Sequence, residues 1–123
     1  MKKQLAGLFF LSVSLICCKP NPAAMIAKKW QPIEAKGESI TPESREILLE
    51  PGNGMAFLPD GRFVTYGAGE QNDTGTYSLS NDYKSLKVYS SQKNETIFEV
   101  QELKTNRLII ENHGLVLVLK PTD

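Results

Sequence analysis

Apolar and polar residues alternate along most of the chain from Gly54 onward, and turn residues interrupt this alternation every ten residues or so. No long segment repeats its apolar residues at helical spacing. The pattern predicts a small all-β domain. Strands are expected around Trp30, Met55, Arg62, Thr74, Ser85, Glu95, Leu108 and Leu115. Eight strands in sequential hairpins predict an up-and-down antiparallel β-barrel.

The turns between these strands predict their registers. Pro59-Asp60-Gly61 forms a three-residue loop that places Phe57 opposite Phe63. A four-residue loop over 81–84 places Tyr77 opposite Val88 and Leu79 opposite Leu86. These pairs share one face of the sheet, so we expect that face to be buried.

The last two hairpins need one irregularity. Leu103 has the wrong parity to share a face with Phe98 and Val100, so a β-bulge is expected near Gln101-Glu102. The turn at His113-Gly114 then pairs Ile110 with Leu117 and Leu108 with Leu119. A turn residue with positive φ is the interpretation we favour for His113 over a metal ligand.

One set of side chains faces inward in these registers and forms either a ligand pocket or a filled core. A third outcome is an interior filled at the base and open near a lid. The set is Trp30, Met55, Phe57, Phe63, Tyr77, Leu79, Leu86, Val88, Phe98, Leu108, Ile110, Leu117 and Leu119. A strip on the opposite face, made of Ile109, Val116 and Val118, either contacts a partner or lies under a short helix over 23–27.

The region before Gly54 is less regular. Lys29 to Glu34 is expected to form the first strand, and Pro32 predicts an edge or irregular strand there. Between 40 and 52, Thr41 suits a helix N-cap and Pro42 the first helical position. We therefore expect a short helix in the first loop, with an extra strand over 47–49 as the alternative.

The N-terminus has the pattern of a targeting segment. Lys2 and Lys3 precede an apolar run from Leu5 to Ile16, which is too short for comfortable membrane spanning but suits a signal peptide. The segment resembles a bacterial lipoprotein signal, with Leu15 three residues before Cys18. This resemblance implies removal of 1–17, acylation of Cys18, a tether over 18–27 and a domain over 28–123. No Asp follows Cys18, so the analogy implies an outer-membrane lipoprotein that faces the periplasm.

Composition and motifs exclude several functions. Lys and Arg number 14 and so do Asp and Glu, which leaves no cationic excess for nucleic acid. Of the two cysteines, one is removed and one acylated, so we expect no disulfide, reactive thiol or thiolate-bound metal. Glu99, Glu102 and Glu111 are interpreted as solvated carboxylates. Since no nucleophile elbow, phosphate-binding loop or zinc motif occurs, we expect no enzyme, no cofactor and no metal site.

Several residues together resemble the small bacterial lipocalin-like domain found in lipoproteins. They are Trp30, the hairpin from Phe57 to Phe63 around Asp60-Gly61, Gly75-Thr76-Tyr77, and Val100 to Leu103 followed by Leu108 and Ile110. The resemblance covers about 28–120. It implies a barrel open at one end, with the loop over 41–50 as a lid. Lipocalins bind small apolar molecules in the barrel.

Two functions follow from these expectations. The first is a membrane-anchored envelope lipoprotein whose barrel binds a small apolar or amphipathic ligand. The alternative is a packed barrel that contacts an envelope protein or the cell wall through its outer face.

Overall fold

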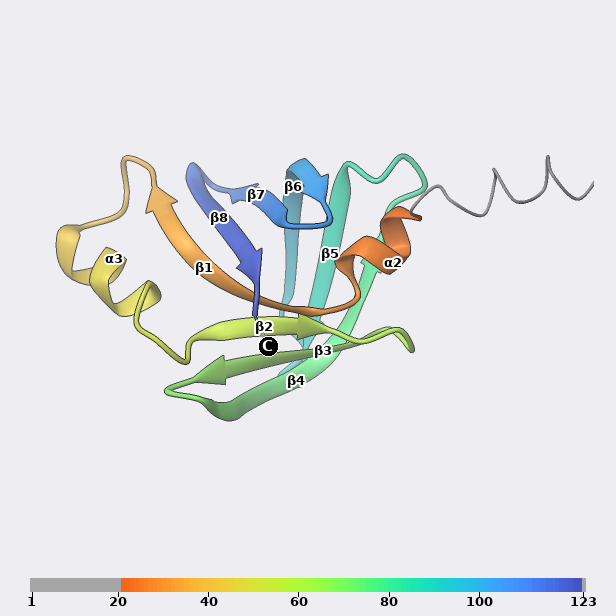
Figure 1. Cartoon of the computed structure of the whole chain (residues 1–123), viewed down its shortest axis with the longest axis horizontal. Coiled ribbons are helices and arrows are strands. Elements are labelled where there is room, and N and C mark those ends of the chain that lie inside the picture. The colour runs from red at the N-terminus through yellow and green to blue at the C-terminus, as the bar shows by residue number, and fades with distance from the viewer. Residues whose placement is uncertain (1–20, 123) are drawn as a thin grey trace, which may run out of the picture.

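The computed structural model describes residues 21–122, which form a β-barrel with two short helices (Figure 1). The predicted signal peptide and the acylated Cys18 lie outside the described residues. The elements in chain order are α2 (Pro22–Ile26), β1 (Lys29–Lys36), α3 (Pro42–Leu48), β2 (Gly54–Phe57), β3 (Arg62–Gly67), β4 (Glu70–Leu79), β5 (Ser85–Ser90), β6 (Glu95–Lys104), β7 (Arg107–Asn112) and β8 (Leu115–Pro121).

The eight strands form a closed barrel in sequence order. Every strand pairs antiparallel with its neighbours, and β8 closes the ring by pairing with β1. This confirms the predicted up-and-down barrel. We call the end with α2 and the connections 58–61, 80–84 and 105–106 the base. The opposite end, with α3 and the connections 68–69, 91–94 and 113–114, is the mouth. No helix in the stretch 21–122 has the length and apolar character needed to cross a membrane.

The predicted registers are confirmed. Phe57 lies opposite Phe63, and the pairs Tyr77–Val88, Leu79–Leu86, Ile110–Leu117 and Leu108–Leu119 all occur. The register of β6 against β7 shifts between Val100 and Glu102, which is the expected bulge. Turn geometry and the burial of one face were therefore sufficient to predict these pairings.

β1 is the irregular strand that Pro32 predicted. It pairs with β2 only through Lys29 and Trp30, and its register on β8 shifts between Pro32 and Glu34. Because proline has no N–H to donate, β1 can continue along β8 while it leaves β2. The prediction of an edge strand is wrong at the start of β1, where the strand pairs on both sides and closes the ring.

α3 is the expected helix, so the alternative of an extra strand over 47–49 is wrong. The Thr41 side chain accepts a hydrogen bond from the Ser44 N–H, and the Ser44 side chain accepts one from the Thr41 N–H. This reciprocal cap, with Pro42 in the first turn and Glu43 beside the positive helix end, favours the helix. None of its residues is fully buried.

The core fills the barrel from the base. Trp30, Phe57, Leu86, Leu108, Ile110 and Leu119 are fully buried, and all the predicted inward-facing residues belong to the same cluster. Met55, Tyr77, Leu79 and Phe98 are only partly buried members. The buried hydrophobic residues all lie between Ile26 and Leu119, so the chain from residue 19 onward contains the whole described core.

α2 extends the domain beyond the predicted boundary at residue 28. Ile26 is fully buried in the core, and the Trp30 Nε1–H donates to its carbonyl at 3.0 Å. The segment 22–26 was predicted to be tether, but Asn21 caps a short helix there, and Ile26 seals the base. The same packing places α2 at the base rather than over the outer strip, so the idea that 23–27 covers that strip is wrong.

Candidate functional site

A cleft of about 320 Å³ lies at the mouth between α3 and the barrel wall. Pro32 on β1, Met55 on β2 and Leu117 on β8 line it from the barrel. Ile47 and Leu48 line it from α3. The remaining lining residues are Asn53, Gly54, Tyr66, Gly67 and Asn72. The cleft is therefore mainly apolar, with two amides and a phenol at its rim.

The cleft exists because β1 and β2 separate after one short stretch of pairing. Beyond Trp30 the ribbon of β1 curves along β8 and away from β2, and α3 lies beside the resulting gap (Figure 1). Gly54 allows the close approach just before this separation, since a Cβ there would lie 2.5 Å from the Trp30 carbonyl oxygen. The start of β2 thus meets the backbone of β1 at Trp30, and the opening begins next to this contact.

Side chains and backbone fasten α3 to both sides of the opening. Arg45 Nε donates to the Ala35 carbonyl at 2.8 Å, which ties the helix to the end of β1. Asn53 Nδ2 donates to the Ile47 carbonyl at 2.5 Å, and Asn53 Oδ1 accepts from the Ala68 N–H at 3.2 Å. The Gly69 N–H donates to the Gly52 carbonyl at 3.0 Å. α3 is therefore held by a few exposed or half-buried hydrogen bonds and by partly buried side chains, and none of its residues is fully buried.

The apolar side chains of the lid segment are divided between core and solvent. Leu48 and Ile40 pack against the core cluster, whereas Ile47 is 61% exposed beside the cleft. The Ile47 side chain thus lies beside the cleft without being buried by it.

The structure brings only two of the predicted inward-facing residues, Met55 and Leu117, to this cleft. The others fill the base and the middle of the barrel, so the interior is packed below and open near α3. Sequence reasoning missed Leu48, Asn53, Tyr66 and Asn72 as lining residues. Pro32 was noticed as a break in the strand, and that break was the available signal for the opening.

The predicted partner strip runs along the outer face of β7 and β8. Val118 is only 8% exposed, while Ile109 and Val116 are half-buried. Charged residues of the neighbouring strands flank the strip. On β1, Glu34 lies opposite Val118 and Lys36 lies opposite Val116. On the other side, Glu102 of β6 lies opposite Ile109, and Glu111 of β7 lies opposite Val116. The strip is thus a narrow apolar line between charged side chains.

A larger hollow, of about 630 Å³, lies on the outer face across β5, β6 and β7. Charged residues of both signs line it, namely Lys84, Glu95, Glu99 and Glu111, together with the exposed Ile97. His113 lies at its edge with φ of 49°, which is the positive turn conformation expected for it. Glu111 accepts a hydrogen bond from the Gly114 N–H at 2.7 Å and so supports the turn. Glu102 forms ion pairs with Lys104 and Arg107.

Titratable groups with shifted pKa values lie at the base rather than at the cleft. Hydrogen bonds from the Arg62 side chain lower the pKa of Asp60, and a hydrogen bond from the Ser80 hydroxyl lowers that of Asp82. Burial raises the pKa of Tyr77, whose hydroxyl donates to the Leu58 carbonyl at 2.9 Å. Over the part of the chain that the structure describes, no group of three His, Cys, Asp or Glu side chains could hold a metal. The cleft is lined by apolar side chains together with two amides and a phenol.

Solved structures share this fold at low sequence identity. An uncharacterized protein from Bacteroides eggerthii superposes with a TM-score of 0.63 at 15% identity, over 79% of this chain and 99% of that one. A lipocalin-like protein from Bacteroides uniformis gives a TM-score of 0.59 at 16% identity, over 80% of this chain and 99% of that one. A further Bacteroides uniformis protein, solved by NMR, gives 0.53 at 18% identity, over 82% of this chain and 92% of that one.

The fold is therefore that of a lipocalin-like barrel. No protein-family profile matches the chain, and no curated protein matches it. The comparisons show the architecture alone.

Proposed function

We propose that this protein is a lipid-anchored envelope lipoprotein whose barrel binds one small apolar or amphipathic molecule in the cleft under α3. The observation that carries this proposal is the lateral opening where β1 leaves β2. Its volume of about 320 Å³ lies at the lower end of the range for ligand pockets, so the ligand is small.

The chemistry of the lining favours an amphipathic ligand. Pro32, Leu48 and Leu117 would contact an apolar body, whereas the amides of Asn53 and Asn72 lie where a polar head could form hydrogen bonds. No ionised side chain belongs to the lining, and the cation described beside it is Lys29 Nζ, 4.0 Å from the centre of the Tyr66 ring. The lipocalin-like fold supports ligand binding only by analogy.

Ligand binding is tested with residues 19–123, purified from the periplasm of a neutral host. Native mass spectrometry should show a bound mass that leaves on mild denaturation, and an apolar fluorescent probe, N-phenyl-1-naphthylamine, should bind the emptied barrel. Leu48→Glu places a carboxylate in the cleft and should weaken probe binding at least about tenfold. Ile97→Glu, at an exposed position on β6, is the matched control and should bind normally. Neither bound mass nor probe binding, or equal binding by both variants, would refute the cleft as the site.

The anchor is tested separately in cells. The protein should fractionate with membranes, and its mass should include a diacylglycerol on the first residue of the mature chain. Cys18→Ser should abolish that mass and release the protein. Cys17→Ser should leave both unchanged, since Cys17 is removed with the signal peptide. A Cys18→Ser protein that keeps the lipid would refute the assignment.

A further inference from the structure

Positive charge gathers at the base of the barrel. Seven cationic side chains lie in the connections of the base, at a strand end there or next to one, against the carboxylates Asp60 and Asp82; Glu102, two residues from the end of β6, is a third carboxylate at this end. Arg62, Lys104 and Arg107 form ion pairs with Asp60 or with Glu102. Lys28, Lys29, Lys84 and Lys120 have no carboxylate within ion-pair distance in the range 21–122.

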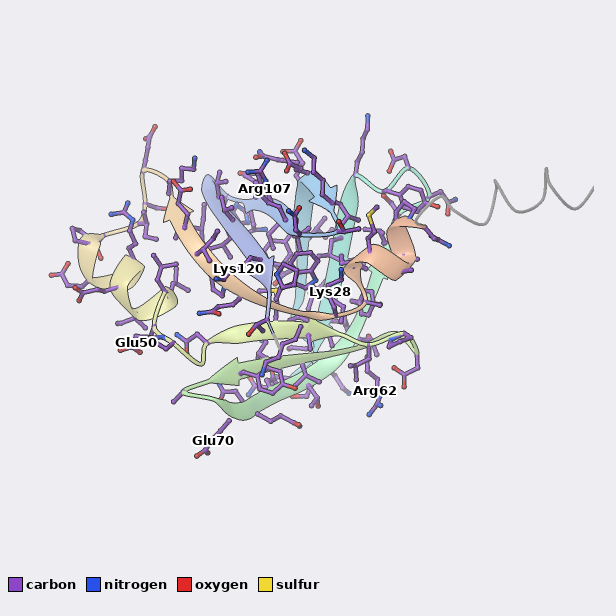
Figure 2. The ribbon with its side chains drawn as sticks, in the orientation of Figure 1. Lys28, Glu50, Arg62, Glu70, Arg107 and Lys120 are labelled. Atoms are coloured by element: carbon purple, nitrogen blue, oxygen red, sulfur yellow. The ribbon has the colours of Figure 1, made fainter. Side chains whose placement is uncertain are left out.

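The mouth carries the opposite charge. By the same criterion it has seven glutamates, at positions 38, 43, 46, 50, 70, 95 and 111, and the three cations Lys36, Arg45 and Lys93. Figure 2 shows Glu50 and Glu70 toward the end that holds α3, and Lys28 and Arg62 toward the end that holds α2. A formal net charge of zero for the whole chain therefore hides a strong asymmetry along the barrel axis.

Of the unpaired lysines, Lys28 is positioned by contacts at the base. Lys28 Nζ donates to the Thr105 carbonyl at 2.9 Å and lies 5.4 Å from the centre of the Trp30 ring. Lys29 Nζ lies 4.0 Å from the centre of the Tyr66 ring, and since Tyr66 lines the cleft at the mouth, this contact lies on the barrel wall rather than at the base. Lys84 and Lys120 are exposed. The contacts of Lys28 hold its ammonium group at the rim of the base without neutralising it.

The chain also enters the barrel at this end. Asn21 caps α2 at the base, and Cys18 precedes it by three residues. Three residues reach at most roughly 11 Å even when fully extended. If Cys18 carries the lipid, as the proposed function holds, the base must lie close to the membrane surface.

We propose that the base is a docking surface for an anionic phospholipid bilayer, so that the barrel stands on its base and its mouth points away from the lipid. Lysine side chains near a negatively charged bilayer add to binding and lose that contribution as salt rises. The acidic mouth would be repelled by the same surface. The cleft under α3 would then open toward the aqueous side.

The experiment uses residues 19–123 without lipid, so that it does not depend on the anchor. Binding to phosphatidylglycerol vesicles and to phosphatidylcholine vesicles is measured by flotation at low ionic strength. The protein should float with the anionic vesicles only and be released by salt. Lys84→Glu with Lys120→Glu should weaken this binding roughly 25-fold or more, as expected for the loss of two lysines near the surface.

The matched control makes the same change of charge at the mouth, with Lys36→Glu and Lys93→Glu, and should bind as the parent chain does. An equal loss in both double variants would show that net charge alone governs binding, and the docking surface would be refuted. No flotation with anionic vesicles would refute it as well. If residues 19–123 float as expected but Cys18 is not acylated in cells, the docking surface stands and the proposed anchor is refuted.

Discussion

The base and the mouth of this barrel are closed in different ways. At the base, Ile26 and Trp30 are fully buried and joined by a hydrogen bond. The Phe57 ring packs there at 5.3 Å from Phe63 and 4.9 Å from Tyr77. At the mouth, α3 has no fully buried residue and is held through Arg45, Gly52 and Asn53.

The difference follows from the size of the domain. A domain of about 100 residues buries a smaller share of its surface than a larger one, so its large apolar side chains are few. Here the largest of them lie toward the base, and the mouth is covered by a helix whose Ile47 is an exposed large apolar side chain. We therefore expect the base to contribute more to stability than the mouth.

Trp30→Ala is expected to have the largest effect. It removes the largest fully buried side chain and the hydrogen bond to α2, so it should lower the free energy of unfolding by about 3–5 kcal/mol. Urea unfolding followed by circular dichroism measures this change. The control Leu48→Ala, at a partly buried position of the lid, should lose about 1 kcal/mol. Equal losses at the two positions would contradict the contrast between base and mouth.

Gly52→Ala should have the next largest effect. Gly52 has φ of 90°, and a Cβ there would lie 2.5 Å from the Gly69 nitrogen, which donates to the Gly52 carbonyl. Backbone strain and this clash together should cost about 1–3 kcal/mol. Gly69→Ala is the matched control, because Gly69 has a similar φ of 84° but open space around its Cβ. Thermal unfolding measures the loss of stability in both variants. If Gly52→Ala loses no more stability than Gly69→Ala, the close approach of the two backbones does not matter.

Asn53→Ala should act on the lid alone. It removes the two hydrogen bonds that join Ile47 to Ala68 through one side chain, each worth about 1 kcal/mol. Amide hydrogen exchange should accelerate over 41–50 and stay unchanged over 22–30. Asn106→Ala, in the exposed turn at the base, should leave both segments unchanged. Faster exchange at the base in Asn53→Ala would mean that the two ends open together.

The predictability of this fold follows the same division. The hairpin registers and the bulge near Glu102 could be predicted because parity and turn length act between neighbours in the sequence. The helix over 42–48 could be predicted because its cap is local. Ile26 was assigned to the tether because its burial depends on Trp30 and β6, and no local pattern marks that contact.

The cleft was harder to predict for the same reason. Pro32, Leu48, Asn53 and Tyr66 come from four separate segments, and only the path of β1 brings them together. Inward-facing parity identified Met55 and Leu117, but parity cannot tell which inward-facing residues fill the interior and which line an opening. That distinction depends on where two strands separate.

Tyr77→Phe is expected to have the smallest effect and tests the base by pH. Burial raises the pKa of Tyr77, so folding favours its neutral hydroxyl, which donates to the Leu58 carbonyl. This contribution, about 1 kcal/mol, is complete below the ordinary tyrosine pKa near 10 and is lost as the pH rises through the higher pKa of the folded state. Urea unfolding should therefore show the parent chain more stable than Tyr77→Phe at pH 8, with the difference gone at strongly alkaline pH. Tyr83→Phe, at an exposed position, should match the parent at pH 8. A difference between parent and Tyr77→Phe that persisted at high pH would mean that the hydroxyl proton is not what Tyr77 contributes, and that its ring alone packs against Phe57 to close the base.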